Sequence, residues 1–167
     1  MKRVLQMLPF FLVALPLWAG GGDGGNTEKP KYNNETYVPT ADEVIHKMFE
    51  MGKVSKDDLI FDLGCGDGRI LYMAAKKYDV GTLVEIRHGD ALRPKDLSDA
   101  TVVVLYMFPE FMNLWLPIAK EKLRPGTRIL SHDYTWDAKY NWPPDQSVTV
   151  KSSVREHRVH MWTVRGK

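Results

Sequence analysis

The strongest chemical signal in the sequence is a glycine-rich segment, 62–68, which reads Asp-Leu-Gly-Cys-Gly-Asp-Gly. Its three alternating glycines allow a tight turn and let a ligand approach the backbone without a side chain in the way. Asp62 and Asp67 flank the turn, and their charge would repel the pyrophosphate that many glycine loops bind. The segment therefore predicts a site for a ligand that carries a cation or an amino group.

Other residues that could do chemistry have weaker patterns. His157 and His160 are three apart on an expected strand, where they point to opposite faces, so we expect core or surface histidines and no metal site. His132-Asp133 would join them only if folding happened to bring it close. Cys65 has no base beside it in the sequence and is not expected to be a nucleophile. The chain holds one cysteine, so it cannot form an intrachain disulfide.

Four aromatic residues gather in the region that follows the third and fourth expected strands: Trp115, Trp136, Tyr140 and Trp142. Aromatic side chains in such a place usually pack in the core or cover its edge. The alternative is that they line a channel for a cationic side chain.

The elements around the glycine segment must place it at one edge of a sheet. The apolar run 59–63 breaks into glycines, as a buried parallel strand does, and 69–78 repeats apolar residues at helical spacing. The other expected elements are strands at 83–87, 101–107 and 127–131, a helix from Thr40 with a capping box to Glu43, a helix at 117–123, and an antiparallel strand pair at 147–151 and 159–164. This alternation predicts an α/β fold with a mostly parallel sheet and an antiparallel edge.

The segment 62–68 resembles motif I of the class I, Rossmann-like S-adenosylmethionine-dependent methyltransferases. More narrowly, the chain resembles small protein-lysine methyltransferases such as the one that modifies the c subunit of mitochondrial ATP synthase. The similarity runs from about Tyr37 to the C-terminus. It is carried, in order, by Tyr37-Val38-Pro39-Thr40, the glycine segment, Gly89-Asp90, the segments 97–103 and 124–128, and Ser131-His132-Asp133.

The resemblance implies S-adenosylmethionine as the cofactor and a protein lysine as the methyl acceptor. Gly64, Gly66 and Gly68, with Cys65 in the same loop, would line the cofactor, and Asp62 or Asp67 would hold its amino group. Asp90 would face the adenine, and Tyr37 would close over the cofactor. Tyr106 and Asp133 would face the substrate, where they either accept a proton from the acceptor amine or only orient it.

The chain departs from this family between the first helix and Gly89-Asp90. About thirty residues are missing there, roughly one strand-helix unit, so the predicted sheet is shortened. The strand 83–87 would then lie beside the strand 59–63. Glu85 follows Gly64 by 21 residues, close to the offset of about 20 typical of a ribose-binding carboxylate. Glu85 is therefore either a substitute for the lost ribose-binding acid or a solvent-facing side chain.

Length and composition limit the classes of protein that the chain can belong to. A chain of 167 residues favours one domain, and 44% hydrophobic with 26% charged residues excludes a disordered protein. The net charge is +2, but Lys2 and Arg3 lie at the N-terminus, so the rest carries no net charge. A neutral body lacks the positive field that nonspecific nucleic-acid binding needs, so no nucleic-acid partner is expected.

The N-terminus has the pattern of a targeting segment. Residues 1–19 place two positive charges before an apolar run, which is typical of a signal peptide or signal anchor. Residues 20–36 are glycine-rich and indicate a flexible linker, which leaves 37–167 as the methyltransferase-like domain. We expect an exported or membrane-anchored protein, or a cytoplasmic one if the apolar start is not a signal.

Three functions remain open on the sequence. The first is a methyltransferase that acts on a protein amine. The second is a catalytically impaired remnant that binds a ligand or partner with the same fold, which the missing unit favours. The third, a nucleotide-binding oxidoreductase, is disfavoured by Asp67 in the loop. The pattern gives no indication of the oligomeric state.

Overall fold

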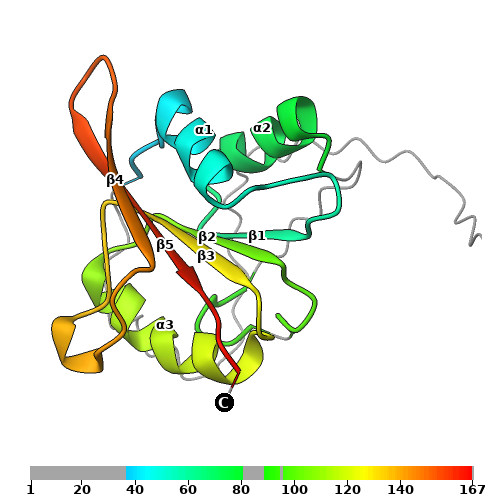
Figure 1. Ribbon diagram of the computed structural model, residues 1–167, viewed down its shortest axis with the longest axis vertical. Helices are drawn as coiled ribbons and strands as arrows, with labels where there is room; N and C mark the ends of the chain where they lie inside the picture. The colour runs from blue at the N-terminus through cyan, green and yellow to red at the C-terminus, as the bar shows by residue number, and fades with distance from the viewer. Residues whose placement is uncertain (1–36, 81–88, 95, 167) are drawn as a thin grey trace, which may run out of the picture. The chain divides into compact units, whose positions relative to one another are not determined.

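The computed structural model describes residues 37–80, 89–94 and 96–166 (Figure 1). The predicted signal segment 1–19, the linker 20–36 and the strand 83–87 with Glu85 lie outside the described residues and stay predictions. Within the described ranges, the helices are too short or too polar to span a membrane.

The centre of the domain is a five-stranded sheet in the order β1-β2-β3-β5-β4. Its strands are β1 (Ile60–Leu63), β2 (Val102–Leu105), β3 (Arg128–His132), β4 (Gln146–Lys151) and β5 (Glu156–Thr163). The first three are parallel, and β5 and β4 continue the sheet as an antiparallel hairpin. The predicted mostly parallel sheet with an antiparallel edge is confirmed.

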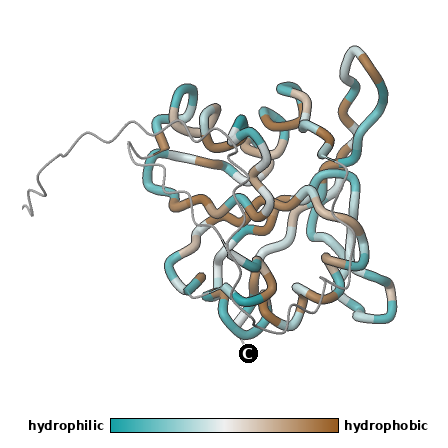
Figure 2. Tube along the Cα trace, turned by 180° about the vertical axis from the view of Figure 1, so that it is seen from behind, coloured by the Kyte–Doolittle hydropathy of each residue, from teal (hydrophilic) through white to brown (hydrophobic). Residues whose placement is uncertain are grey.

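Helices cover both faces of the sheet (Figure 1). The helices α1 (Asp42–Met51) and α2 (Arg69–Tyr78) pack on one face, and α3 (Pro109–Lys122) packs on the other. The strand β2 is buried along its whole length because its residues alternate between the two cores. Figure 2 shows the apolar residues concentrated in the central strands. A short 3-10 helix, η1 (Ala138–Tyr140), precedes the hairpin.

The start of α1 differs from the sequence prediction. The helix begins at Asp42, and Ala41 precedes it without a side-chain cap, so the predicted capping box at Thr40 is wrong. The Thr40 hydroxyl instead lies 3.2 Å from Nδ1 of His132, on β3. A buried tertiary partner has replaced the local one.

The predicted helix 117–123 is also corrected, because α3 starts eight residues earlier, with Pro109 at its first turn. Pro117 lies inside the helix, where a proline costs about 3 kcal/mol. The helix accommodates it because its buried side chains pack against the sheet. These are Phe111, Met112, Trp115, Leu116 and Ala119.

Candidate functional site

A pocket of about 170 Å³ opens at the carboxyl ends of β1 and β2. Its walls are the segment 37–40, the start of the glycine loop, and residues that follow β2 and β3. Ligands of open α/β sheets bind at this edge, where loops from several parallel strands converge. The pocket therefore lies where the sequence placed the ligand.

The glycine loop has a backbone that only glycine adopts without strain. Gly64, Gly66 and Gly68 have φ angles of +82°, +56° and +77°. A Cβ atom on Gly66 would lie 2.2 Å from Cε2 of Tyr37, whose ring covers this turn. Gly64, Cys65 and Asp67 lie on the pocket wall, whereas Gly66 and Gly68, also predicted to line the cofactor, do not.

The two carboxylates of this loop have different surroundings. Asp67 binds the Arg69 guanidinium with both oxygens, and this bond lowers the pKa of Asp67 to about 2. Asp62 also lines the pocket, but its Oδ2 is buried and has no hydrogen-bond partner in the described structure. Burial and the nearby charge of Asp67 raise the pKa of Asp62 to about 7. Asp62 is therefore the carboxylate that is free to hold a cationic group.

Tyr106 lies on the pocket wall directly after β2. Its ring packs on His132, with centroids 3.9 Å apart, and its hydroxyl accepts a hydrogen bond of 3.2 Å from Arg155. Burial and the neighbouring Asp133 raise the pKa of Tyr106, so the phenol stays protonated at neutral pH. This favours an orienting role over a basic one.

Asp133, the second residue predicted to face the substrate, is not part of the pocket wall. Its carboxylate accepts a 2.5 Å bond from the Arg155 side chain and a 2.9 Å bond from the Arg158 amide. Burial alone would raise the pKa of Asp133, but these bonds outweigh it and the pKa is lowered. A carboxylate held in this way is a poor proton acceptor.

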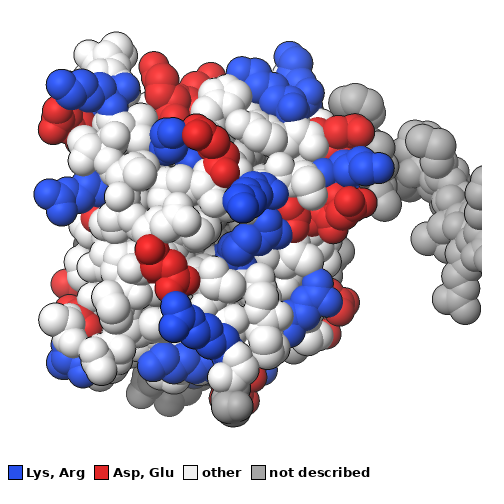
Figure 3. Space-filling view, viewed as in Figure 1, with Lys and Arg blue, Asp and Glu red and all other residues white. Residues whose placement is uncertain are grey.

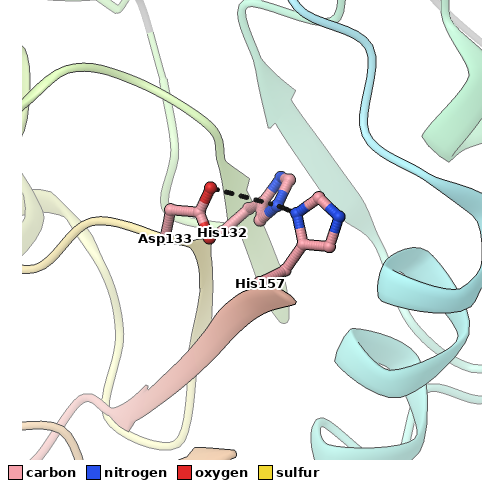
Figure 4. Close-up of side chains that lie close together, drawn as sticks. All are labelled: His132, Asp133 and His157. Carbon is pink, nitrogen blue, oxygen red and sulfur yellow. Dashed lines mark hydrogen bonds and ion pairs between the residues drawn. The ribbon is translucent and has the colours of Figure 1, made fainter. Parts of the chain in front are cut away.

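His132 and His157 lie side by side (Figure 4), and the ring of His132 also packs on Tyr106. Nε2 of His132 is 2.9 Å from Nδ1 of His157 and 3.4 Å from Oδ2 of Asp133. Burial lowers the pKa of His132 to about 4, so the ring is neutral at pH 7. His160, three residues along β5, pairs instead with Ser147. The histidines are thus buried and hydrogen-bonded, as expected. No pattern in the sequence predicts the contact between His132 and His157.

The remaining predicted site residues lie apart from the pocket wall or outside the described residues. Asp90 is exposed, and its Oδ1 accepts a bond from the Leu92 amide. Glu85 lies outside the described residues. The four aromatic residues considered for a channel do not line the pocket, and Trp115 of α3 and Trp136 are buried in the core between α3 and the sheet.

Several pocket residues were not found from the sequence. Arg69 follows the glycine loop directly, and its charge beside Asp67 was an available signal. Phe108 and Tyr134 had no local pattern, because they meet at the pocket only after β2 and β3 have paired. Arg155 does not line the pocket, but it bonds Tyr106 on the wall once the hairpin has assembled.

The pocket fits a cofactor that carries an ammonium group. The unpartnered oxygen of Asp62 is an acceptor for such a cation, and burial makes their attraction strong. Gly64 of the glycine loop lies on the same wall as Asp62.

Comparisons with known proteins agree with this assignment. The chain is 31% identical to a protein-lysine N-methyltransferase of Saccharolobus islandicus (strain REY15A), over 77% of this chain and 92% of the relative. It is 34% identical to an RNA methyltransferase from Salinibacter ruber, solved in complex with S-adenosyl-L-homocysteine, with a TM-score of 0.66 over 78% of this chain and 95% of that one.

A tRNA methyltransferase of B. subtilis shares the fold alone, at 13% identity and a TM-score of 0.57, over 78% of this chain and 68% of that one. No protein-family model matches the sequence.

Proposed function

Because the chain belongs to the class I S-adenosylmethionine-dependent methyltransferases, we propose that it methylates a lysine amine on a protein. The observation that carries this proposal is the charge of the pocket wall. Among the described residues of the wall the one cation is Arg69, which Asp67 binds, while Asp62 adds a buried carboxylate. A nucleic-acid acceptor would need free cations for its phosphates, whereas a lysine side chain brings its own.

Aromatic side chains on the wall support a lysine acceptor. Tyr134 packs against Tyr106 and Phe108, with ring centroids 6.2 and 5.9 Å apart. Phe108 is 39% exposed, so an incoming side chain can reach its ring. Aromatic faces attract an ammonium group and also pack against the methylene stem of lysine.

The pocket residues have separate tasks in the reaction. The cofactor supplies a methyl group on a sulfonium, which is transferred by an in-line displacement that depends on alignment and exclusion of water. Asp62, Gly64 and Tyr37, all on the pocket wall, would hold the cofactor. Tyr106 would orient the acceptor amine, and Arg155 fixes Tyr106 through their hydrogen bond.

A second candidate is methylation of an RNA amine. The Salinibacter ruber relative, named an RNA methyltransferase, favours it. The charge distribution does not, because on the face shown in Figure 3 acidic and basic side chains are interspersed and form no continuous basic stripe.

The test is incubation of the full chain with labelled S-adenosylmethionine and either a protein extract or total RNA. We expect label on protein, located on lysine by mass spectrometry. Tyr134→Ala should reduce transfer at least about tenfold if the ring contributes a cation–π contact, while Tyr72→Ala, which alters an exposed tyrosine of α2 away from the pocket, should not. Label on RNA alone would contradict the proposal. Cofactor binding without transfer to either would favour the impaired remnant.

A further inference from the structure

Four side chains form a continuous line of hydrogen bonds from the pocket wall to the hairpin turn. Thr40 Oγ1 is 3.2 Å from Nδ1 of His132, and Nε2 of His132 is 2.9 Å from Nδ1 of His157. Nε2 of His157 is in turn 2.9 Å from Oγ of Ser152. Thr40 lines the pocket, the two histidines are more than nine-tenths buried, and Ser152 is half-buried in the turn between β4 and β5.

Both rings are held in the form that can pass a proton. Burial lowers the pKa of His132 to about 4, and burial with the charge of Arg155 lowers that of His157. A neutral imidazole has one N–H and one lone pair, so it accepts a proton on one side as it releases one on the other. The hydrogens of the line have two possible arrangements: all donors can point toward the hairpin turn, or all can point toward the pocket. Each bond of the line has one donor and one acceptor in both arrangements. Moving one proton through converts the first arrangement into the second.

The charges around the pair come from each element packed against it. Asp133, after β3, lies 3.4 Å from Nε2 of His132, and Arg155, in the hairpin turn, binds Asp133. Glu43 of α1 adds a negative charge that acts on His157, and Tyr106 packs on His132 from the pocket side. Asp133 thus stabilises any positive charge that passes through His132.

The proposed function requires a path for a proton. A lysine amine is protonated at neutral pH, with an ordinary pKa near 10.4, and must lose one proton before it can react. Its lone pair then forms the bond to the methyl carbon, while the electrons of the carbon–sulfur bond go to sulfur. The methylated amine takes over the positive charge of the sulfonium, so each turnover releases the one proton that the amine lost.

We propose that Thr40, His132, His157 and Ser152 form a relay that carries the proton of the acceptor amine from the pocket to solvent. This inference depends on the proposed function, because the proton that the relay carries is the one that the lysine amine loses before transfer. His157 and Ser152 do not line the pocket, so they act on the reaction through the relay and not by touching the substrate.

A metal site is the other use of this cluster. The ligand atoms of His132, Asp133 and His157 lie within 4.8 Å of one another. The contacts favour the relay, because Arg155 binds Asp133 Oδ2 and the two rings already bond each other directly. A guanidinium beside the carboxylate opposes a second cation.

The test compares two buried histidines of β5 that each pair with a serine. His157→Asn retains a partner for His132 Nε2 but cannot pass a proton. His160→Asn makes the same change at a ring that bonds Ser147 and lies outside the line. Transfer to the lysine substrate is measured from pH 6 to 10 with the full chain, together with calorimetry of S-adenosylhomocysteine binding and circular dichroism.

We expect His157→Asn to lower kcat at pH 7 at least about tenfold, within the range of acid–base effects, and to approach wild-type rates near pH 10, where the amine loses its proton unaided. The affinity of His157→Asn for S-adenosylhomocysteine should match that of wild type. The pH profile of His160→Asn should also match wild type. Ser152→Ala, at the outer end, should have a smaller effect because water can replace the hydroxyl. Imidazole added to His157→Ala should restore activity.

Several results would overturn the relay. These are a wild-type pH profile for His157→Asn, an equal loss in His160→Asn, or zinc bound tightly by wild type and lost in His157→Asn, which would show a metal site. Product binding by wild type without transfer to lysine at any pH would refute the proposed function, and the relay with it. Lysine transfer with an unaffected His157→Asn would refute the relay alone.

Discussion

Asp62 and Asp133 lie at the same edge of the sheet, but their surroundings are opposite. Asp62 is in β1, with one buried oxygen that has no partner among the described residues and a pKa raised to about 7. Asp133 follows β3 in a left-handed conformation (φ +63°), and Arg155 and the Arg158 amide hold its carboxylate and lower its pKa.

The contrast separates a carboxylate that binds a ligand from one that holds the scaffold. A buried carboxylate without a partner destabilises the free protein, and a bound cation removes that penalty. A carboxylate whose oxygens are already bonded has little left to offer a ligand. The same residue type at the same edge thus has two tasks, which its hydrogen-bond partners decide.

The largest expected effect is on the stability of the free protein as a function of pH. The pKa of Asp62 is about 7 in the folded state and about 3.9 in an unfolded chain, so its contribution is full below pH 4 and is lost as the pH rises through 7. Asp62→Asn should therefore be more stable than wild type at pH 8, by on the order of 3 kcal/mol, and this gain should vanish at pH 4. Denaturant unfolding at both pH values measures it, and equal stabilities at pH 8 would contradict the buried environment.

The same substitution should weaken cofactor binding. Asn has the shape of Asp but lacks the charge that holds an ammonium group, so Asp62→Asn should cost about 2 kcal/mol of binding free energy. Calorimetry with S-adenosylhomocysteine measures it. Asp133→Asn is the matched control and should bind like wild type. An equal loss in both variants would remove the distinction between the two carboxylates.

Asp133→Asn should instead affect stability. Its ion pair with Arg155 is partly exposed and screened by solvent, so the expected loss at pH 7 is about 1 kcal/mol. The lowered pKa of Asp133 means that wild type has this contribution above pH 4 and loses it as the pH falls through the folded-state pKa. The difference between variant and wild type should therefore shrink in acid. Thermal unfolding at pH 7 and pH 3 tests this.

Asp90 extends the comparison to a third carboxylate and carries the smallest expected effect. It is exposed and lies outside the pocket wall, and its carboxylate accepts a hydrogen bond from the backbone amide of Leu92. If it faces the adenine, Asp90→Ala should weaken S-adenosylhomocysteine binding by about 1 kcal/mol and leave the binding of methionine unchanged. An unchanged dissociation constant for both ligands would place Asp90 away from the cofactor.

The sequence was sufficient for the parts of the fold that have a local cause. The apolar runs of β2 and β3 are buried on both faces and that of β1 is partly buried, and the composition of these runs indicates parallel strands. It was misleading at Thr40 and Pro117, where local rules predicted a helix cap and a helix start. A bond to His132 replaced the cap, and the packing of α3 on the sheet outweighed the cost of an internal proline.

The glycine loop is what the sequence determined by itself, because glycine adopts the positive φ angles found at Gly64, Gly66 and Gly68 without strain and the residue type is read directly from the sequence. Tertiary structure decided which carboxylate is free and which histidines meet. Arg155 reaches Asp133 from 22 positions away, and Thr40 reaches His132 from 92. Contacts of that range leave no pattern in a single sequence, since they exist only after the strands have paired and water has been excluded. The electrostatics of the site come from those contacts, because burial sets the pKa values of Asp62 and His132.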